Sequence, residues 1–204
     1  MLNILLTGVG GQGTVLAAKV LAQAALNKGW HVRTAETIGM AQRGGSVTSH
    51  VRMGSAGEEV HSPLLTKGTA DLVIAFEPGE AARVIPYLAS DGVLVTAATP
   101  IQPVTAALAA QPYRSEDVLT GIEAALQGKP DARLVVVDDA ALIEKVGTRR
   151  ALNTVLLASA MATGRVPISV EEVKAAIAAC VKPRFVEMNL AAVDIAVEAT
   201  SEAV

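Results

Sequence analysis

Residues 3–16, NILLTGVGGQGTVL, decide the fold predicted for this chain. The apolar run over residues 3–9 is short and ends in glycines, which is typical of a buried parallel strand. Over residues 12–28 aliphatic side chains recur at helical spacing, and Lys28-Gly29 is a helix-stop signal. The stretch therefore predicts a strand, a glycine-rich turn and a helix, which together form the first unit of an α/β fold.

Strands and helices continue to alternate along the rest of the chain. Further strands are predicted at 31–38, 46–53, 71–76, 92–97 and 133–138. Helices are predicted at 80–88, 116–127, 139–146, 150–163, 170–181 and from 183 to about 199. This alternation predicts one domain over residues 1–204, with three α/β/α layers and a mostly parallel, Rossmann-like sheet. Because no crossover helix separates the strands at 31–38 and 46–53, a mixed sheet is the alternative.

The composition excludes several classes of function. The chain has 204 residues, a net charge of -3 at pH 7 and only 2% aromatic residues, which leaves no basic or base-stacking surface for nucleic acid. The single Cys180 cannot form a disulfide framework, a four-cysteine zinc site or an iron-sulfur cluster. No apolar run reaches the roughly 18 residues of a membrane span, and the first residues lack a basic signal-peptide region. The sequence therefore predicts a cytoplasmic protein with neither nucleic-acid nor membrane partners.

The first glycine loop matches the dinucleotide-binding fingerprint through Gly8, Gly10 and Gly13, between a strand and a helix. Glycines permit a tight turn, and the free amides at the helix N-terminus attract an anionic group. Glu36 lies near the distance, about 20 positions on, at which an acidic residue binds a ribose hydroxyl. Two interpretations stay open. One is a nucleotide or phosphate site, including a stand-alone NAD(P)-binding protein; the other is tight packing of the strand on the helix.

A second glycine loop, AQRGGS, occupies residues 41–46. Arg43 supplies a planar, permanently charged fork for carboxylate or phosphate, and Gly44 and Gly45 can present successive amides to an anion. Because the first two strands end at the same edge of an open α/β sheet, the two loops can face one crevice. The alternative is a simple turn between two strands, with Arg43 in solvent.

Other polar residues receive structural interpretations. His50 and Arg52 share one face of a strand, and we expect that face to be solvated. Asp138 and Asp139 end a strand, where they can cap the following helix or, as the alternative, bind a metal. Cys180 lies in an apolar helix and is expected in the core.

The two loops together resemble the gamma subunits, or gamma domains, of the 2-oxoacid:ferredoxin oxidoreductases. The residues that carry this resemblance are Gly10, Gly11, Gln12 and Gly13 before an alanine-rich helix, and Gln42, Arg43, Gly44 and Gly45 before a strand with His50-Val51-Arg52. The segments NTVLL at 153–157 and KPRFVEMNL at 182–190 are similar to later segments of the small subunits of the indolepyruvate enzymes. The resemblance covers most of the chain outside residues 98–133.

The resemblance implies a function that composition does not show. Enzymes of this family oxidatively decarboxylate a 2-oxoacid, join the acyl group to coenzyme A and pass electrons to ferredoxin, using thiamine diphosphate and iron-sulfur clusters. In the indolepyruvate enzymes these cofactors belong to the large partner subunit. The chain is then a small subunit, inactive alone, that reaches ferredoxin through the complex.

The eight loop residues Gly10 to Gly13 and Gln42 to Gly45 are the cofactor-binding candidates. The resemblance places them either at the subunit interface or at the coenzyme A side of the active site. A pure scaffold, whose glycines serve packing alone, is the remaining alternative. No residue of this chain is assigned a catalytic or metal-binding role.

Overall fold

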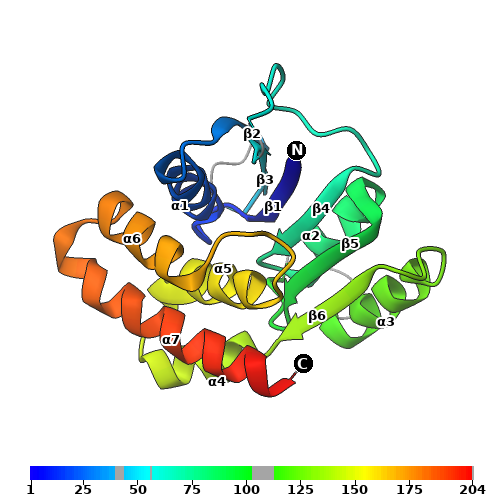
Figure 1. Cartoon of the computed structure of the whole chain (residues 1–204). Helices are drawn as coiled ribbons and strands as arrows, with labels where there is room; N and C mark the ends of the chain where they lie inside the picture. Colours follow the sequence, from blue (N-terminus) through cyan, green and yellow to red (C-terminus); the bar gives the residue numbers. More distant parts are fainter. Residues whose placement is uncertain (40–43, 56, 103–112, 204) are drawn as a thin grey trace.

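The computed structural model describes residues 1–39, 44–55, 57–102 and 113–203. A central sheet lies between two groups of helices (Figure 1), so the predicted three-layer α/β/α class is confirmed. The strands are β1 (Leu2–Val9), β2 (His31–Ile38), β3 (Ser46–Gly54), β4 (Ala70–Ala75), β5 (Leu88–Ala97) and β6 (Arg133–Val137). Their order across the sheet is β2-β3-β1-β4-β5-β6.

The sheet is mixed, as the alternative prediction held. Strands β1, β4, β5 and β6 run parallel to one another, whereas β3 runs antiparallel to both of its neighbours, β1 and β2. β2 and β3 form a hairpin, which needs no crossover helix. The hairpin returns the chain beside β1 with its first strand at the outer edge.

Seven α-helices cover the sheet: α1 (Thr14–Asn27), α2 (Pro78–Val84), α3 (Ser115–Leu126), α4 (Asp139–Val146), α5 (Leu152–Ala162), α6 (Val170–Cys180) and α7 (Val186–Ala203). Helices α2 and α3 lie on one face, and the others lie on the opposite face (Figure 1). On that face α6 packs on α1, and α7 packs on α5, as an outer layer. No helix in the described part of the chain is long and apolar enough to cross a membrane.

Strand periodicity divides the core between the two faces. Ile4 and Leu6 of β1 face the α1 and α5 side, and Leu5 between them faces α2. On α1 the fully buried positions include Ala17, Ala18, Ala24 and Ala25. Such small side chains let the helix approach the sheet closely, which explains a core with few aromatics.

Two element boundaries differ from the predicted ones. Strand β5 begins at Leu88 rather than at residue 92, because the predicted turn at Ser90 to Gly92 lies inside the strand at a shift of register. A Cβ at Gly92 would lie 2.8 Å from the carbonyl oxygen of Ala70, so glycine allows the close approach there. Helix α2 begins two residues early because Glu77 caps it and Pro78 occupies its first turn.

The predicted solvated face at His50 and Arg52 is wrong. His50 is buried; its Nδ1 accepts a hydrogen bond from the Leu65 amide at 3.2 Å, and its ring meets Tyr87 edge-on. Arg52 is half-buried and donates to Asn3 Oδ1 at 3.0 Å. The segment after β3 covers this face, and the alternation of residues within a strand carries no information about such a cover.

We expect acid to destabilise the fold through His50. Burial lowers the pKa of His50 below 6.5, so its contribution to stability is complete above that value and is lost as pH falls through the native pKa. Urea unfolding at several pH values from about 7 to about 5 should show a falling free energy of unfolding in the wild type, with a weaker fall in His50→Gln. Equal slopes for the two proteins would contradict this role.

Candidate functional site

The two glycine loops meet at the edge of the sheet where β1 ends. The Gly10 amide donates a hydrogen bond of 2.8 Å to the carbonyl oxygen of Gly45. The hairpin makes this possible, because β3 begins at Ser46, directly opposite Val9. Among the candidate residues of the second loop, Gly44 and Gly45 are described, whereas Gln42 and Arg43 lie outside the described residues.

The glycines of the first loop differ in what requires them. A Cβ at Gly8 would lie 2.9 Å from Gln12 Oε1 and 3.0 Å from the Phe76 Cβ, so close packing requires glycine there. Gly11 has φ of 105°, and no atom lies within 4 Å of where a Cβ would stand, so its backbone requires glycine beside open space. Gly13 combines both constraints, with φ of 84° and Asn153 atoms 3.0 Å away.

Gln12 fastens the first loop to the neighbouring strand. Its Oε1 accepts from the Val9 amide at 2.7 Å, and its Nε2 donates to the carbonyl oxygen of Phe76 at 2.6 Å. Both ends of the side-chain amide therefore have protein partners. Gln12 sets the path of the loop, and only the rest of the residue faces the space above it.

A pocket of about 470 Å³ opens above this loop. The residues that line it come from three loops and from the start of α5: Gly11, Gln12, Gly13, Leu16, Thr99, Ile101, Asp139, Arg149, Arg150, Leu152 and Asn153. Asn153 is only 7% exposed, and its side-chain amide has no hydrogen-bond partner among the described residues. A buried amide without a partner favours a ligand group in the pocket, because leaving it unpaired costs free energy.

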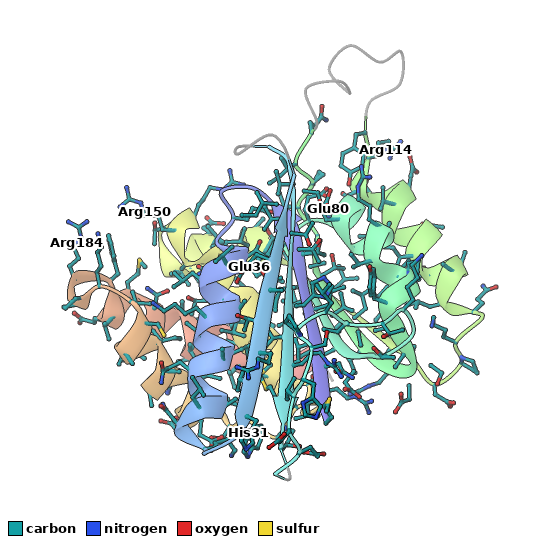
Figure 2. All side chains as sticks on the ribbon, turned by 90° about the horizontal axis from the view of Figure 1, so that it is seen from above. His31, Glu36, Glu80, Arg114, Arg150 and Arg184 are labelled. Carbon is teal, nitrogen blue, oxygen red and sulfur yellow. The ribbon has the colours of Figure 1, made fainter. Side chains whose placement is uncertain are left out.

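The charges around the pocket favour an anion. Helix α1 starts there at Gly13 with no side-chain cap and no acidic residue in its first turn, so its first amides and the helix dipole face the pocket. Arg149 and Arg150 are exposed at the opposite wall, and Figure 2 shows Arg150 projecting from the molecule. Asp139 is buried, and its Oδ1 accepts from the amides of Ala98 and Thr99 at 3.0 and 2.9 Å.

A second polar cluster joins the loops on the α2 side of the sheet. Glu80 is buried, accepts a hydrogen bond of 2.5 Å from the Ser46 hydroxyl and pairs with Arg83 at 3.1 Å. Glu77 caps α2 and accepts from the Tyr113 hydroxyl at 2.6 Å. Burial and the hydrogen bond to Glu77 raise the pKa of Tyr113, so the phenol stays protonated and holds its segment against α2.

The geometry does not support the NAD(P) alternative. In a dinucleotide-binding fold, the acidic residue that binds the ribose ends the strand beside β1. Here β3 separates β2 from β1, and Glu36 pairs with Ser49, which in turn pairs with Leu6. Glu36 therefore lies two strands away from the glycine loop and below its level.

The pocket contains residues that sequence reasoning missed as candidates. Asn153, Arg149, Arg150 and Asp139 lie far along the chain from the first loop, and no local pattern connects them to it. Asp138 does cap α4 as predicted, by accepting from the Ala141 amide. Cys180 packs against the core as predicted, and burial raises the pKa of its thiol, so it is a poor nucleophile.

Comparison with known sequences places these features in a family. The model of the pyruvate ferredoxin/flavodoxin oxidoreductase family matches residues 3–199. The indolepyruvate oxidoreductase subunit IorB of Pyrococcus horikoshii is 38% identical over 201 residues, which cover 98% of this chain and 96% of the relative. The subunit of the same name from Thermococcus kodakarensis is 37% identical over 200 residues, with the same coverage.

Solved structures share the fold. The gamma subunit of a keto/oxoacid ferredoxin oxidoreductase from Geobacter sulfurreducens PCA superposes with a TM-score of 0.70 at 23% identity, over the whole of both chains. The 2-oxoglutarate:ferredoxin oxidoreductase of Magnetococcus marinus, with 2-oxoglutarate, coenzyme A and succinyl-CoA bound, gives 0.72 at 18% identity, and this chain covers 31% of it. The resemblance noted from the two loops is thereby confirmed. The chain belongs to the pyruvate ferredoxin/flavodoxin oxidoreductase family.

Proposed function

We propose that this chain is the small subunit of an indolepyruvate:ferredoxin oxidoreductase and works in the cytoplasm as one gamma-type domain of residues 1–204. The observation that carries the proposal is the identity of 37–38% to subunits of that name over nearly the whole length of both chains. In the proposed complex a larger subunit decarboxylates the 2-oxoacid. The acyl group passes to coenzyme A, and the electrons pass to ferredoxin.

The residues of this chain do not fit the metal cofactor of such an enzyme. Iron-sulfur clusters are held by several cysteine thiolates, and the sequence has Cys180 alone. Within the described ranges no three His, Cys, Asp or Glu side chains gather to hold a metal ion. We therefore assign the iron-sulfur clusters and thiamine diphosphate to the larger partner, and no catalytic step to a side chain of this chain.

Coenzyme A is the cofactor that the pocket does fit. Its phosphates need amide donors and cations. The pocket supplies the first amides of α1, the unpaired Asn153 amide and the guanidinium groups of Arg149 and Arg150. We propose that this wall, with Gly10 to Gly13, Gly44, Gly45 and the predicted Gln42 and Arg43, holds the phosphate end of coenzyme A.

Reconstitution tests the proposed reaction. The chain is co-expressed without oxygen with a thiamine-dependent large subunit, and dye reduction is followed with indolepyruvate and coenzyme A. We expect co-purification and turnover that requires both chains. Full turnover by the large subunit alone would contradict a requirement for this chain.

We expect Arg150→Ala and Asn153→Ala to raise the KM for coenzyme A roughly tenfold each, with a smaller change in kcat, because each removes one hydrogen-bonding group worth about 1.4 kcal/mol. The KM for indolepyruvate should stay unchanged. Arg184→Ala is the matched control, since Arg184 is also an exposed arginine but does not line the pocket. An unchanged KM for coenzyme A in both pocket variants and in Arg43→Ala would favour the scaffold alternative.

A further inference from the structure

Strand β2 leaves one long edge of the sheet open among the described residues. It ends the strand order, and it pairs with β3 without a bulge from His31 opposite Gly54 to Ile38 opposite Val47. None of its eight residues is buried. It contains no proline and no lysine, which commonly protect an edge strand from pairing with another chain.

The outward backbone groups of β2 can be identified. Just beyond the strand, the Gly39 amide donates to the carbonyl oxygen of Ser46 at 2.9 Å. Antiparallel strands alternate the direction of their backbone groups, so Ala35 and Thr37 also point toward β3. The residues that present N–H and C=O groups to the open edge are therefore Val32, Thr34, Glu36 and Ile38.

We infer that a second copy of this chain covers the edge, with β2 pairing antiparallel to β2 about a two-fold axis. Such an axis stands perpendicular to the joined sheet, so each side chain keeps its face and residues of one face oppose each other. A two-fold axis at Ala35 meets this condition. It places Val32 opposite Ile38 and Thr34 opposite Glu36, and all four present outward backbone groups.

The side chains select this register over its neighbours. An axis at Arg33 or at Glu36 would set two like charges directly opposite each other, which is unfavourable. An axis at Thr34 would set Val32 against Glu36. The axis at Ala35 opposes no like charges and covers Ile38, which at 58% has the largest exposure among the large apolar side chains described.

The mass of the full-length chain in solution tests the interface, independently of the proposed function. Sedimentation equilibrium at about 1 to 100 μM should show a dimer for the wild type. Glu36→Pro removes an outward N–H without touching the β2–β3 ladder, so we expect a monomer with unchanged circular dichroism. Glu36→Gln keeps the N–H and should stay dimeric. A monomeric wild type, including one in which Glu36→Pro impairs only assembly with the large subunit, would overturn the inference.

Substitutions at Thr34 test the register and do not depend on proline. With the axis at Ala35, Thr34→Lys faces Glu36 of the second copy at two symmetric positions and should tighten the dimer, on the order of tenfold in Kd. Thr34→Glu should weaken it by a similar factor. If the axis lies at Thr34 instead, each new charge faces its own copy, so both variants would weaken the dimer and the register would be wrong.

Discussion

Gly13→Ala should lower the free energy of unfolding by about 2 to 4 kcal/mol, which for a chain of this size is a fall in Tm of roughly 4 to 16 °C. Two costs add. Gly13 has φ of 84°, where a side chain is strained, and the new Cβ would lie 3.0 Å from Asn153. Asn153 is buried at the start of a packed helix and has little room to withdraw. Thermal and urea unfolding measure the loss.

Gly147 provides a matched control for that experiment. It ends α4 with φ of 80°, but no atom lies within 4 Å of a Cβ there. Gly147→Ala therefore carries the backbone cost alone, about 1 to 2 kcal/mol. Equal losses in Gly13→Ala and Gly147→Ala would show that contact with Asn153 adds nothing. If the contact matters, Gly13→Ala made in an Asn153→Ala background should cost less than Gly13→Ala alone.

Asp139→Ala should destabilise the fold by about 3 kcal/mol, because two amides lose a charged acceptor at once. Oδ1 of Asp139 accepts from Ala98 and Thr99, which continue the chain beyond β5 along one wall of the pocket. Urea unfolding measures the change. Asp139→Asn keeps an acceptor oxygen, so we expect less than half of the loss.

Asp138→Ala separates this role from helix capping. Asp138 is exposed and only caps α4, so its removal should cost about 1 kcal/mol. A larger loss for Asp138→Ala than for Asp139→Ala would contradict the assignment of Asp139 to the strand end. Asp139→Asn should also retain coenzyme A in the assembled enzyme, because it removes a negative charge from an anion pocket.

The fold was largely predictable because its signals are local. Runs of Val, Ile and Leu mark the central strands, and the helix α3 between two proline-containing segments has its own apolar periodicity. The direction of β3 is not encoded locally, since an antiparallel and a parallel strand can share the same residue pattern. Its place between β1 and β2 decides against the ribose-binding role of Glu36.

The pocket was predictable only in part, since its residues are distant in sequence. The first loop indicates an anion site through its glycines, and the meeting of both loops follows from their places at strand ends. Asn153 stands at the start of an apolar helix, where a lone amide resembles any polar residue near a helix end. Only the tertiary contact with Gly13 shows that it faces the pocket.

Helix α5 gives the pocket a rigid floor. Nine consecutive residues from Asn153 to Met161 are buried between the sheet and α7, and the Thr154 hydroxyl donates to Asn189 of α7. The Asn153 side chain is therefore ordered before any ligand arrives. Binding does not incur the entropy loss of fixing this side chain, so more of the interaction free energy is retained as affinity.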